Sequence, residues 1–243
     1  MTYAFLFFIS NPLWVGAFPQ SLIAENSTEN DQKGTPPDFT GDGQPGNGSA
    51  GGSRDGCPSV ETQLTVLIPD TNVGRTTFEQ PTLWFYVPYA PAQIKLATFS
   101  LQDASGEDIG DPVEVSLPSK SPGFVSITLP QSLAIESTDT QYHWYFELYC
   151  DANGSPVYVD GWIERVEKST ELQTQLDNEA LAEDLAYTNS LIWFDAIATL
   201  ATLRTQNPND SELLQRWQTL LTATGVSLGD LPEGPFVGEV TIQ

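Results

Sequence analysis

The period of the apolar residues changes once along this chain, near Glu167. Between Val60 and Val166, apolar residues recur mostly at every second position and are interrupted by Pro, Gly, Asn and Asp, which is typical of short strands joined by turns. After Glu167 the period becomes helical. We therefore predict an α+β fold: an antiparallel, immunoglobulin-like β-sandwich followed by a C-terminal helical hairpin or three-helix segment. The expected strands are 60–68, 81–88, 93–102, 112–118, 123–130, 141–150 and 156–166, and the expected helices are 170–186, 189–206 and 210–224.

The regions outside the strands follow from the same pattern. Residues 1–24 hold two apolar blocks and then small residues, as in the apolar core and cleavage site of a secretory signal, although no Lys or Arg precedes Lys33. A weak signal, a start further upstream, a retained anchor and a cytosolic protein all stay open.

Residues 57–167 are expected to form the sandwich. Residues 168–243 are expected to form a helical segment packed on it, with a short tail that adds an edge strand through Val237, Val240 and Ile242.

Residues 25–56 are rich in Gly, Pro, Asn and acidic residues, and Phe39 is their only aromatic residue. Such a segment cannot bury enough apolar surface to offset the entropy that is lost on ordering. We therefore predict a disordered acidic linker between the signal segment and the sandwich.

The two cysteines, Cys57 and Cys150, lie at the start of the expected sandwich and at the end of one of its strands. We expect them to form a disulfide, which requires an oxidising compartment and agrees with export. Two unrelated buried thiols are the alternative.

The charge and the residue counts exclude several classes of protein. Nine Lys and Arg residues against 32 Asp and Glu residues give a formal net charge of -23, so neither nucleic acid nor anionic lipid is expected as a partner. No stable membrane insertion is expected after removal of the signal. One His and two Cys residues cannot build a His-rich metal site, a zinc finger or an iron–sulfur cage, and we expect no metal and no cofactor. The acids are scattered, which favours solubility over an acidic face for a basic partner.

The strands 141–150 and 156–166 flank the turn-forming run 151–155 and should form a hairpin. Placing Cys150 opposite Val157 puts apolar side chains on one face, and a slip by one residue would mix the two faces. The other face then pairs Tyr149 with Tyr158, Glu147 with Asp160, Tyr145 with Trp162, and His143 with Glu164.

This second face holds the candidate ligand-binding residues Tyr145, Trp162, Glu147 and Asp160. Two opposed carboxylates beside aromatic rings can bind or hydrolyse a sugar. Two other interpretations compete: the carboxylates are simply solvated, or the C-terminal helices bury the aromatic surface. We assign no catalytic residue, because the only histidine, His143, and Cys150 lie on opposite faces of one strand.

Five segments occur in the order of a known family: 51–58 (GGSRDGCP), 81–89 (PTLWFYVPY), 99–103 (FSLQD), 161–165 (GWIER) and 192–196 (IWFDA). With these motifs, residues 57–224 resemble a cyanobacterial family of exported proteins that is known only as a domain of unknown function. The resemblance implies an envelope or secretion-related role, because genes of this family often lie near caspase-like peptidases with tetratricopeptide repeats and near two-partner secretion components. It implies no catalytic residues.

We therefore expect a non-enzymatic interaction or scaffolding module of the cell envelope, periplasmic or secreted, with an envelope or secreted protein as its partner. The alternative is a carbohydrate-binding or carbohydrate-active domain that uses the aromatic and acidic sheet face, with a polysaccharide as ligand. Solvent exposure of Trp162 separates the two functions, because a ring that stacks on a sugar must be exposed.

Overall fold

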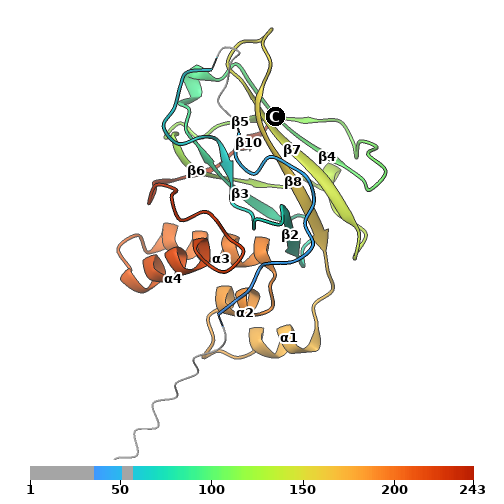
Figure 1. Cartoon of the computed structure of the whole chain (residues 1–243), viewed down its shortest axis with the longest axis vertical. Coiled ribbons are helices and arrows are strands. Elements are labelled where there is room, and N and C mark those ends of the chain that lie inside the picture. The colour runs from blue at the N-terminus through green and yellow to red at the C-terminus, as the bar shows by residue number, and fades with distance from the viewer. Residues whose placement is uncertain (1–35, 51–56) are drawn as a thin grey trace, which may run out of the picture. The chain divides into compact units, whose positions relative to one another are not determined.

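Strands precede helices along most of the chain, as the change of period near Glu167 predicts (Figure 1). The computed structural model describes residues 36–50 and 57–243; the expected signal segment 1–24 and residues 25–35 and 51–56 of the expected linker lie outside the described residues. The strands are β1 (Thr65–Val66), β2 (Val73–Thr76), β3 (Thr82–Val87), β4 (Leu96–Gln102), β5 (Val113–Ser116), β6 (Gly123–Thr128), β7 (Gln141–Tyr149), β8 (Val157–Arg165), β9 (Phe236–Glu239) and β10 (Thr241–Ile242). The helices are α1 (Thr170–Leu176), α2 (Glu183–Asn189), α3 (Trp193–Gln206) and α4 (Ser211–Leu221). The α+β class is confirmed.

The described strands form two mixed sheets. Sheet A has the order β1-β3-β6-β9, and sheet B has the order β10-β5-β4-β7-β8-β2. Most neighbours are antiparallel, but β2 runs parallel to β8 and β9 runs parallel to β6. The wholly antiparallel arrangement is therefore wrong at these two edges. The tail supplies β9 to one sheet and β10 to the other. It therefore forms two edge strands where one through Val237, Val240 and Ile242 was expected.

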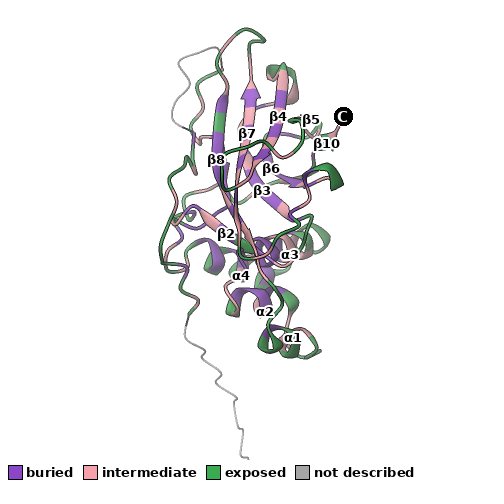
Figure 2. Ribbon diagram, turned by 90° about the vertical axis from the view of Figure 1, so that its right-hand side faces the viewer, coloured by how far each residue is buried: buried purple, intermediate pink, exposed green. Residues whose placement is uncertain are grey.

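The core lies between the two sheets, where aromatic side chains from β3, β4 and β7 meet. Phe85 of β3 contacts Trp144 and Phe146 of β7, with ring centroids 5.7 and 4.7 Å apart, and Phe99 of β4 stacks on Trp144. Buried and half-buried residues alternate along β4 and β7 (Figure 2), as in strands with one face in a core. Burial of these rings is the main force that holds the two sheets together.

Sheet A is buried on both faces, which explains the nearly continuous apolar runs of β3 and β6. On its outer face Phe124 contacts Trp217 of α4 and Phe236 of the tail, with ring centroids 5.6 and 5.2 Å apart. α3 packs on β3 and β2. α4 thus lies on sheet A, and α3 lies on β3 and on β2 at the edge of sheet B. The alternative in which the helices cover the face of Tyr145 and Trp162 is wrong.

The helical part differs in detail from the prediction. The expected helix 170–186 is interrupted, because α1 ends at Leu176 and α2 begins at Glu183. α3 and α4 lie within the expected ranges 189–206 and 210–224. The indole Nε1 of Trp193, at the start of α3, donates to Leu67 O at 2.8 Å and fixes this helix to the sandwich. In the part of the chain that the structure describes, no helix is both long enough and apolar enough to span a membrane.

β7 and β8 form the expected hairpin, but their register differs by two residues from the predicted one. The observed pairs include Leu148 with Val157, Tyr145 with Asp160, and His143 with Trp162. A shift by two keeps every side chain on its face, so the apolar inner face and the polar outer face are as predicted. The loop is longer than 151–155, because Cys150 lies outside the ladder.

Residues 36–50, called the strap below, lie against both sheets, and Figure 1 shows this segment in blue beside β2 and β8. At the edge of sheet A, Val66 N donates to Gly48 O at 2.9 Å. At the edge of sheet B, Asp160 N donates to Asn47 O at 3.2 Å, just before the residues of β8 that pair with β2. The strap therefore covers edge groups of both sheets, and the prediction of disorder is wrong for these residues.

Glycines let the strap lie this close to the sheets. A Cβ atom at Gly43 would lie 2.7 Å from Thr71 O, and one at Gly46 would lie 2.9 Å from Asp160 Oδ2; only glycine fits such close approaches. Phe39 is the large apolar anchor of the strap and packs edge-to-face on the indole at the start of α3, with ring centroids 5.0 Å apart. The low apolar content of the strap thus reflects main-chain contact.

The expected disulfide between Cys57 and Cys150 is confirmed, with Cα atoms 5.0 Å apart. It joins the segment before β1 to the residue that follows β7 across a sequence separation of 93 residues. In the chain-entropy model, such a link stabilises the fold by restricting the unfolded chain.

Replacing both cysteines by serine should lower the free energy of unfolding by about 3–5 kcal/mol, because the unfolded chain regains its loop entropy. Urea unfolding of the variant and of the oxidised wild type measures the difference. Reductant should shift the wild-type midpoint to that of the variant. An equal mass gain on alkylation with and without reductant would contradict the pairing.

Candidate functional site

The four residues predicted as a ligand site share the outer face of sheet B, but they are not paired as predicted. Tyr145 lies opposite Asp160, and Glu147 lies opposite Tyr158. The predicted pairs of Glu147 with Asp160 and of Tyr145 with Trp162 are therefore wrong. The register places Asp160, Tyr145 and Trp162 around one histidine, and it leaves Glu147 in a separate, neighbouring group.

Asp160 is the centre of the first group. It is only 4% exposed, and a buried carboxylate needs hydrogen-bond donors to replace water. Its Oδ2 accepts from His143 Nε2 at 2.7 Å, and its Oδ1 accepts from Asn47 N of the strap at 2.9 Å. The Tyr145 hydroxyl lies 3.1 Å from His143 Nδ1, so it donates to this nitrogen when the ring is neutral. We call these four residues the Asp160 cluster.

Trp162 packs on this cluster and on the strap. Its indole stacks on the His143 ring, with centroids 4.2 Å apart and an angle of 8° between the planes. Its Nε1 donates to Pro45 O of the strap at 3.0 Å. One ring face and the indole donor are thus used within the protein, and the side chain is half-buried.

In the Asp160 cluster a tyrosine hydroxyl, a histidine ring and an aspartate carboxylate are linked in a row. A hydrolytic triad links a serine hydroxyl, a histidine ring and an aspartate carboxylate in the same way. Burial raises the pKa of the Tyr145 hydroxyl, and the nearby Asp160 charge raises this pKa further. The hydroxyl is protonated at neutral pH with or without this shift, and both Asp160 oxygens are used, by His143 and by Asn47 of the strap. The cluster holds the main chain of the strap through the Asn47 amide.

Asn72 is a residue of this site that the sequence did not single out. It is 7% exposed, has φ 57°, and its side chain lies against Gly46 of the strap and Gly161 of β8. Neither its amide nitrogen nor its amide oxygen has a partner among the described residues. An unpaired buried polar group costs about 1–3 kcal/mol. Its position after Pro69-Asp70-Thr71 signals a turn, but no sequence signal reveals its burial.

The second group is an open patch made of Thr98, Glu147, Tyr149 and Tyr158. Glu147 Oε2 accepts from Thr98 Oγ1 at 3.1 Å and from the Tyr149 hydroxyl at 3.4 Å. Tyr158 lies opposite Glu147 and is 39% exposed. The patch therefore presents aromatic rings and one carboxylate to solvent on β4, β7 and β8.

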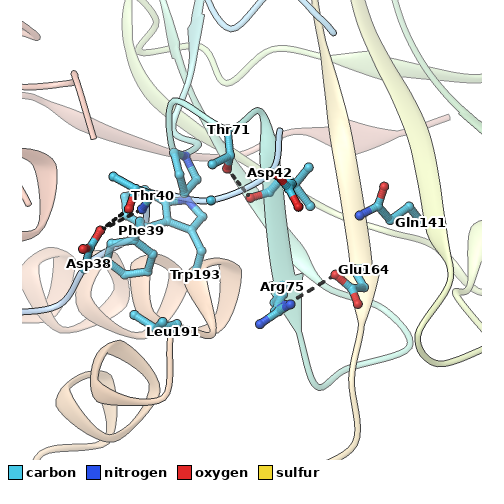
Figure 3. A pocket seen from close by; sticks show the side chains of 13 residues that line it. Asp38, Phe39, Thr40, Asp42, Thr71, Arg75, Gln141, Glu164, Leu191 and Trp193 are labelled. Carbon is cyan, nitrogen blue, oxygen red and sulfur yellow. Dashed lines mark hydrogen bonds and ion pairs between the residues drawn. The ribbon is translucent and has the colours of Figure 1, made fainter. Parts of the chain in front are cut away.

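A cavity of about 400 Å³ lies beside the strap, between β2 and the start of α3 (Figure 3). Phe39 and Trp193 line one side of it, and Arg75, which is ion-paired with Glu164 at 3.3 Å, lies on the other side. Asp42 adds a second carboxylate to the lining. Across residues 36–50 and 57–243, no three His, Cys, Asp or Glu side chains gather as a metal site would need.

A second buried carboxylate, Asp195, belongs to the IWFDA segment and joins α3 to the end of β2. It is 3% exposed. Its Oδ1 accepts from Thr76 Oγ1 at 2.6 Å, and its Oδ2 accepts from Thr77 N and Thr77 Oγ1 at 2.9 and 2.7 Å. Burial raises the pKa of Asp195 against the lowering effect of these hydrogen bonds. The carboxylate of Asp195 therefore links α3 to the end of β2 through hydrogen bonds.

The raised pKa of Asp195 predicts how stability changes with pH. Because the folded state holds this proton more tightly than the unfolded state, the protonated carboxyl adds stability below the unfolded pKa of 3.8, and this stability is lost as the pH rises through the folded pKa. As the pH falls from 7 towards 3.8, the free energy of unfolding of the wild type should rise relative to that of Asp195→Asn.

Urea unfolding of both proteins at a series of pH values measures this difference. Asp103→Asn is the control, because hydrogen bonds from Ser105 and Glu107 lower the pKa of the exposed Asp103 carboxyl. As the pH falls, the free energy of unfolding of the wild type should therefore fall relative to that of Asp103→Asn. A pH-independent difference between the wild type and Asp195→Asn would contradict the raised pKa.

Comparison with protein-family models identifies the described domain. Residues 49–236 match the model described as Domain of Unknown Function (DUF928), a range that contains β1 to β8 and all described helices. Searches of curated proteins and of solved structures found no match. Since the match covers most of the sequence, the chain belongs to the family described as Domain of Unknown Function (DUF928).

Proposed function

We propose that this protein is a non-enzymatic interaction module that acts outside the cytoplasm and binds an envelope or secreted protein through the open patch. The observation that supports this most is the exposure of the patch. Tyr158 is 39% exposed beside Glu147 and Tyr149, while α4 is packed on sheet A and α3 on β3 and β2. Tyrosines are enriched at protein interfaces because their rings bury apolar area and their hydroxyls still form hydrogen bonds.

The Asp160 cluster supports binding over catalysis. The carboxylate of Asp160, the ring of His143 and the Tyr145 hydroxyl are used in contacts within the protein. A reaction at this face would have to break the contacts that hold the strap.

Export is supported by the Cys57–Cys150 disulfide, since structural disulfides persist in oxidising compartments. The cyanobacterial origin, the envelope or secretion-related role and the immunoglobulin-like nature of the sandwich are further parts of this proposal. The first two rest on the family resemblance of the five sequence motifs.

Substitution of Tyr158 by Asp should reduce recovery of a protein partner from envelope extracts by about tenfold, because it places a second acid beside Glu147 and removes an aromatic contact. The wild type and Phe78→Asp serve as baits for comparison, since Phe78 is 47% exposed outside the patch. Mass spectrometry of the captured proteins measures recovery. Equal recovery on all three baits would exclude the patch as the binding surface.

Carbohydrate binding is the alternative function. It is favoured by the exposure of Tyr158 beside Glu147, a ring and a carboxylate that could bind a sugar together. Of the four residues first proposed for this function, Asp160 and Trp162 are held by the strap, so Tyr145 and Glu147 would have to carry it. Retention of envelope polysaccharide that is lost in both Tyr158→Ala and Glu147→Gln would favour this function over the first.

A further inference from the structure

The strap fills a site that is built to hold an extended chain. Ala50 N donates to Leu64 O at 2.9 Å, and Gln44 N donates to Thr71 O at 2.8 Å. Together with the contacts of Gly48 and Asn47 at Val66 and Asp160, these bonds join main-chain groups of the strap to the edges of β1 and β8 and to the turn before β2. Main-chain bonds to sheet edges accept any extended segment, as in binding by strand addition.

Two side-chain contacts add selectivity for an aromatic residue that is followed, six residues later, by proline. Phe39 packs on Trp193 with ring centroids 5.0 Å apart. Six residues later, Pro45 O accepts the indole N–H of Trp162. A groove in which Trp side chains contact an extended, proline-containing chain is a known way of recognising peptides.

The strap is an imperfect occupant of this site. Gly46 covers the carboxamide of Asn72, and neither atom of that carboxamide is paired among the described residues. A chain whose peptide groups face Asn72 would pair both atoms and gain free energy that the strap does not. The family match begins at Ser49, so the edges belong to the family domain, whereas most of the strap precedes it.

The charge around the site favours a basic occupant. The strap carries Asp38 and Asp42 and contains no Lys or Arg. Asp70, Asp160 and Glu164 lie along its path, and Arg75, which is ion-paired with Glu164, lies beside it. A second copy of this chain would bring another strap with two acids and a net charge of -23, and like charges repel. A segment with Lys or Arg in place of the two acids would be attracted.

We propose that the edges of β1 and β8 beneath the strap are a binding site for a segment of a partner protein. This segment is basic and extended, and it contains an aromatic residue and, six residues later, Pro-Gly. The strap is the intramolecular competitor of this segment. The site is separate from the open patch, so either proposal can fail alone. The affinity measured for an added peptide depends on how often the strap leaves the site.

The test uses the full chain and a fluorescein-labelled peptide with the sequence of residues 36–50 carrying Asp38→Lys and Asp42→Lys. Fluorescence anisotropy measures its dissociation constant. Phe39→Ala weakens the strap but not the peptide, so this variant should bind about tenfold more tightly than the wild type. Gly46→Ala should act in the same way, because its Cβ would lie 2.9 Å from Asp160 Oδ2; it provides a second route if Phe39→Ala does not fold.

Asn72→Gly should leave the affinity for this peptide unchanged. The change removes the unpaired carboxamide, and glycine readily adopts the φ of 57° found at this position. The strap and the peptide both place Gly46 against this position, so both gain equally, and the peptide should bind as it does to the wild type. Phe78→Ala is the matched control for Phe39→Ala, and it should bind as the wild type does.

Two results would overturn the proposal. Equal affinity of the wild type, Phe39→Ala and Gly46→Ala would show that the peptide does not compete with the strap. Equal affinity of Phe39→Ala for the lysine peptide and for the unchanged acidic peptide would remove the preference for a basic partner and make a second copy of the chain the better occupant. Weaker binding of the lysine peptide at high salt would support the charge argument.

Discussion

The buried carboxylate of Asp160 joins three parts of the molecule that are far apart in sequence. It belongs to β8, accepts from His143 of β7, and accepts from Asn47 of the strap. Without these donors a carboxylate at this depth would be strongly unfavourable, so β7 and the strap must be in place when β8 is buried. Trp162 depends on the same contact, because its indole N–H donates to Pro45, two residues before Asn47.

The strap divides the outer face of sheet B into two parts with different roles. The covered part holds the Asp160 cluster and Trp162, whose polar atoms are used within the protein. The open part holds Glu147 and Tyr158, which remain available to a partner. The helices leave this face free because α4 buries Trp217 against Phe124 of sheet A and α3 packs on β3 and β2. A binding role for sheet B is thus a consequence of how the layers are stacked.

The sequence predicts most strands and both faces of the β7–β8 hairpin, because apolar residues alternate along each strand. It could not predict the register, since a shift by two residues leaves this alternation unchanged. It missed β2, whose residues VGRT contain one large apolar side chain. It missed the strap because few apolar residues and many glycines indicate disorder and close main-chain contact equally well. The structural role of Asp195 depends on Thr76 and Thr77, more than a hundred residues away.

Hydrogen exchange of the full chain is the most direct test of whether the strap is part of the folded domain. The amides of Gln44, Asn47 and Ala50 donate to Thr71 O, Asp160 Oδ1 and Leu64 O, so peptides from residues 36–50 should exchange much more slowly than an unstructured chain. In Asp160→Ala the protection of Asn47 should be lost. Exchange of the whole segment at the unstructured rate, with β3 and β7 still protected, would contradict the ordered strap and the site built on it.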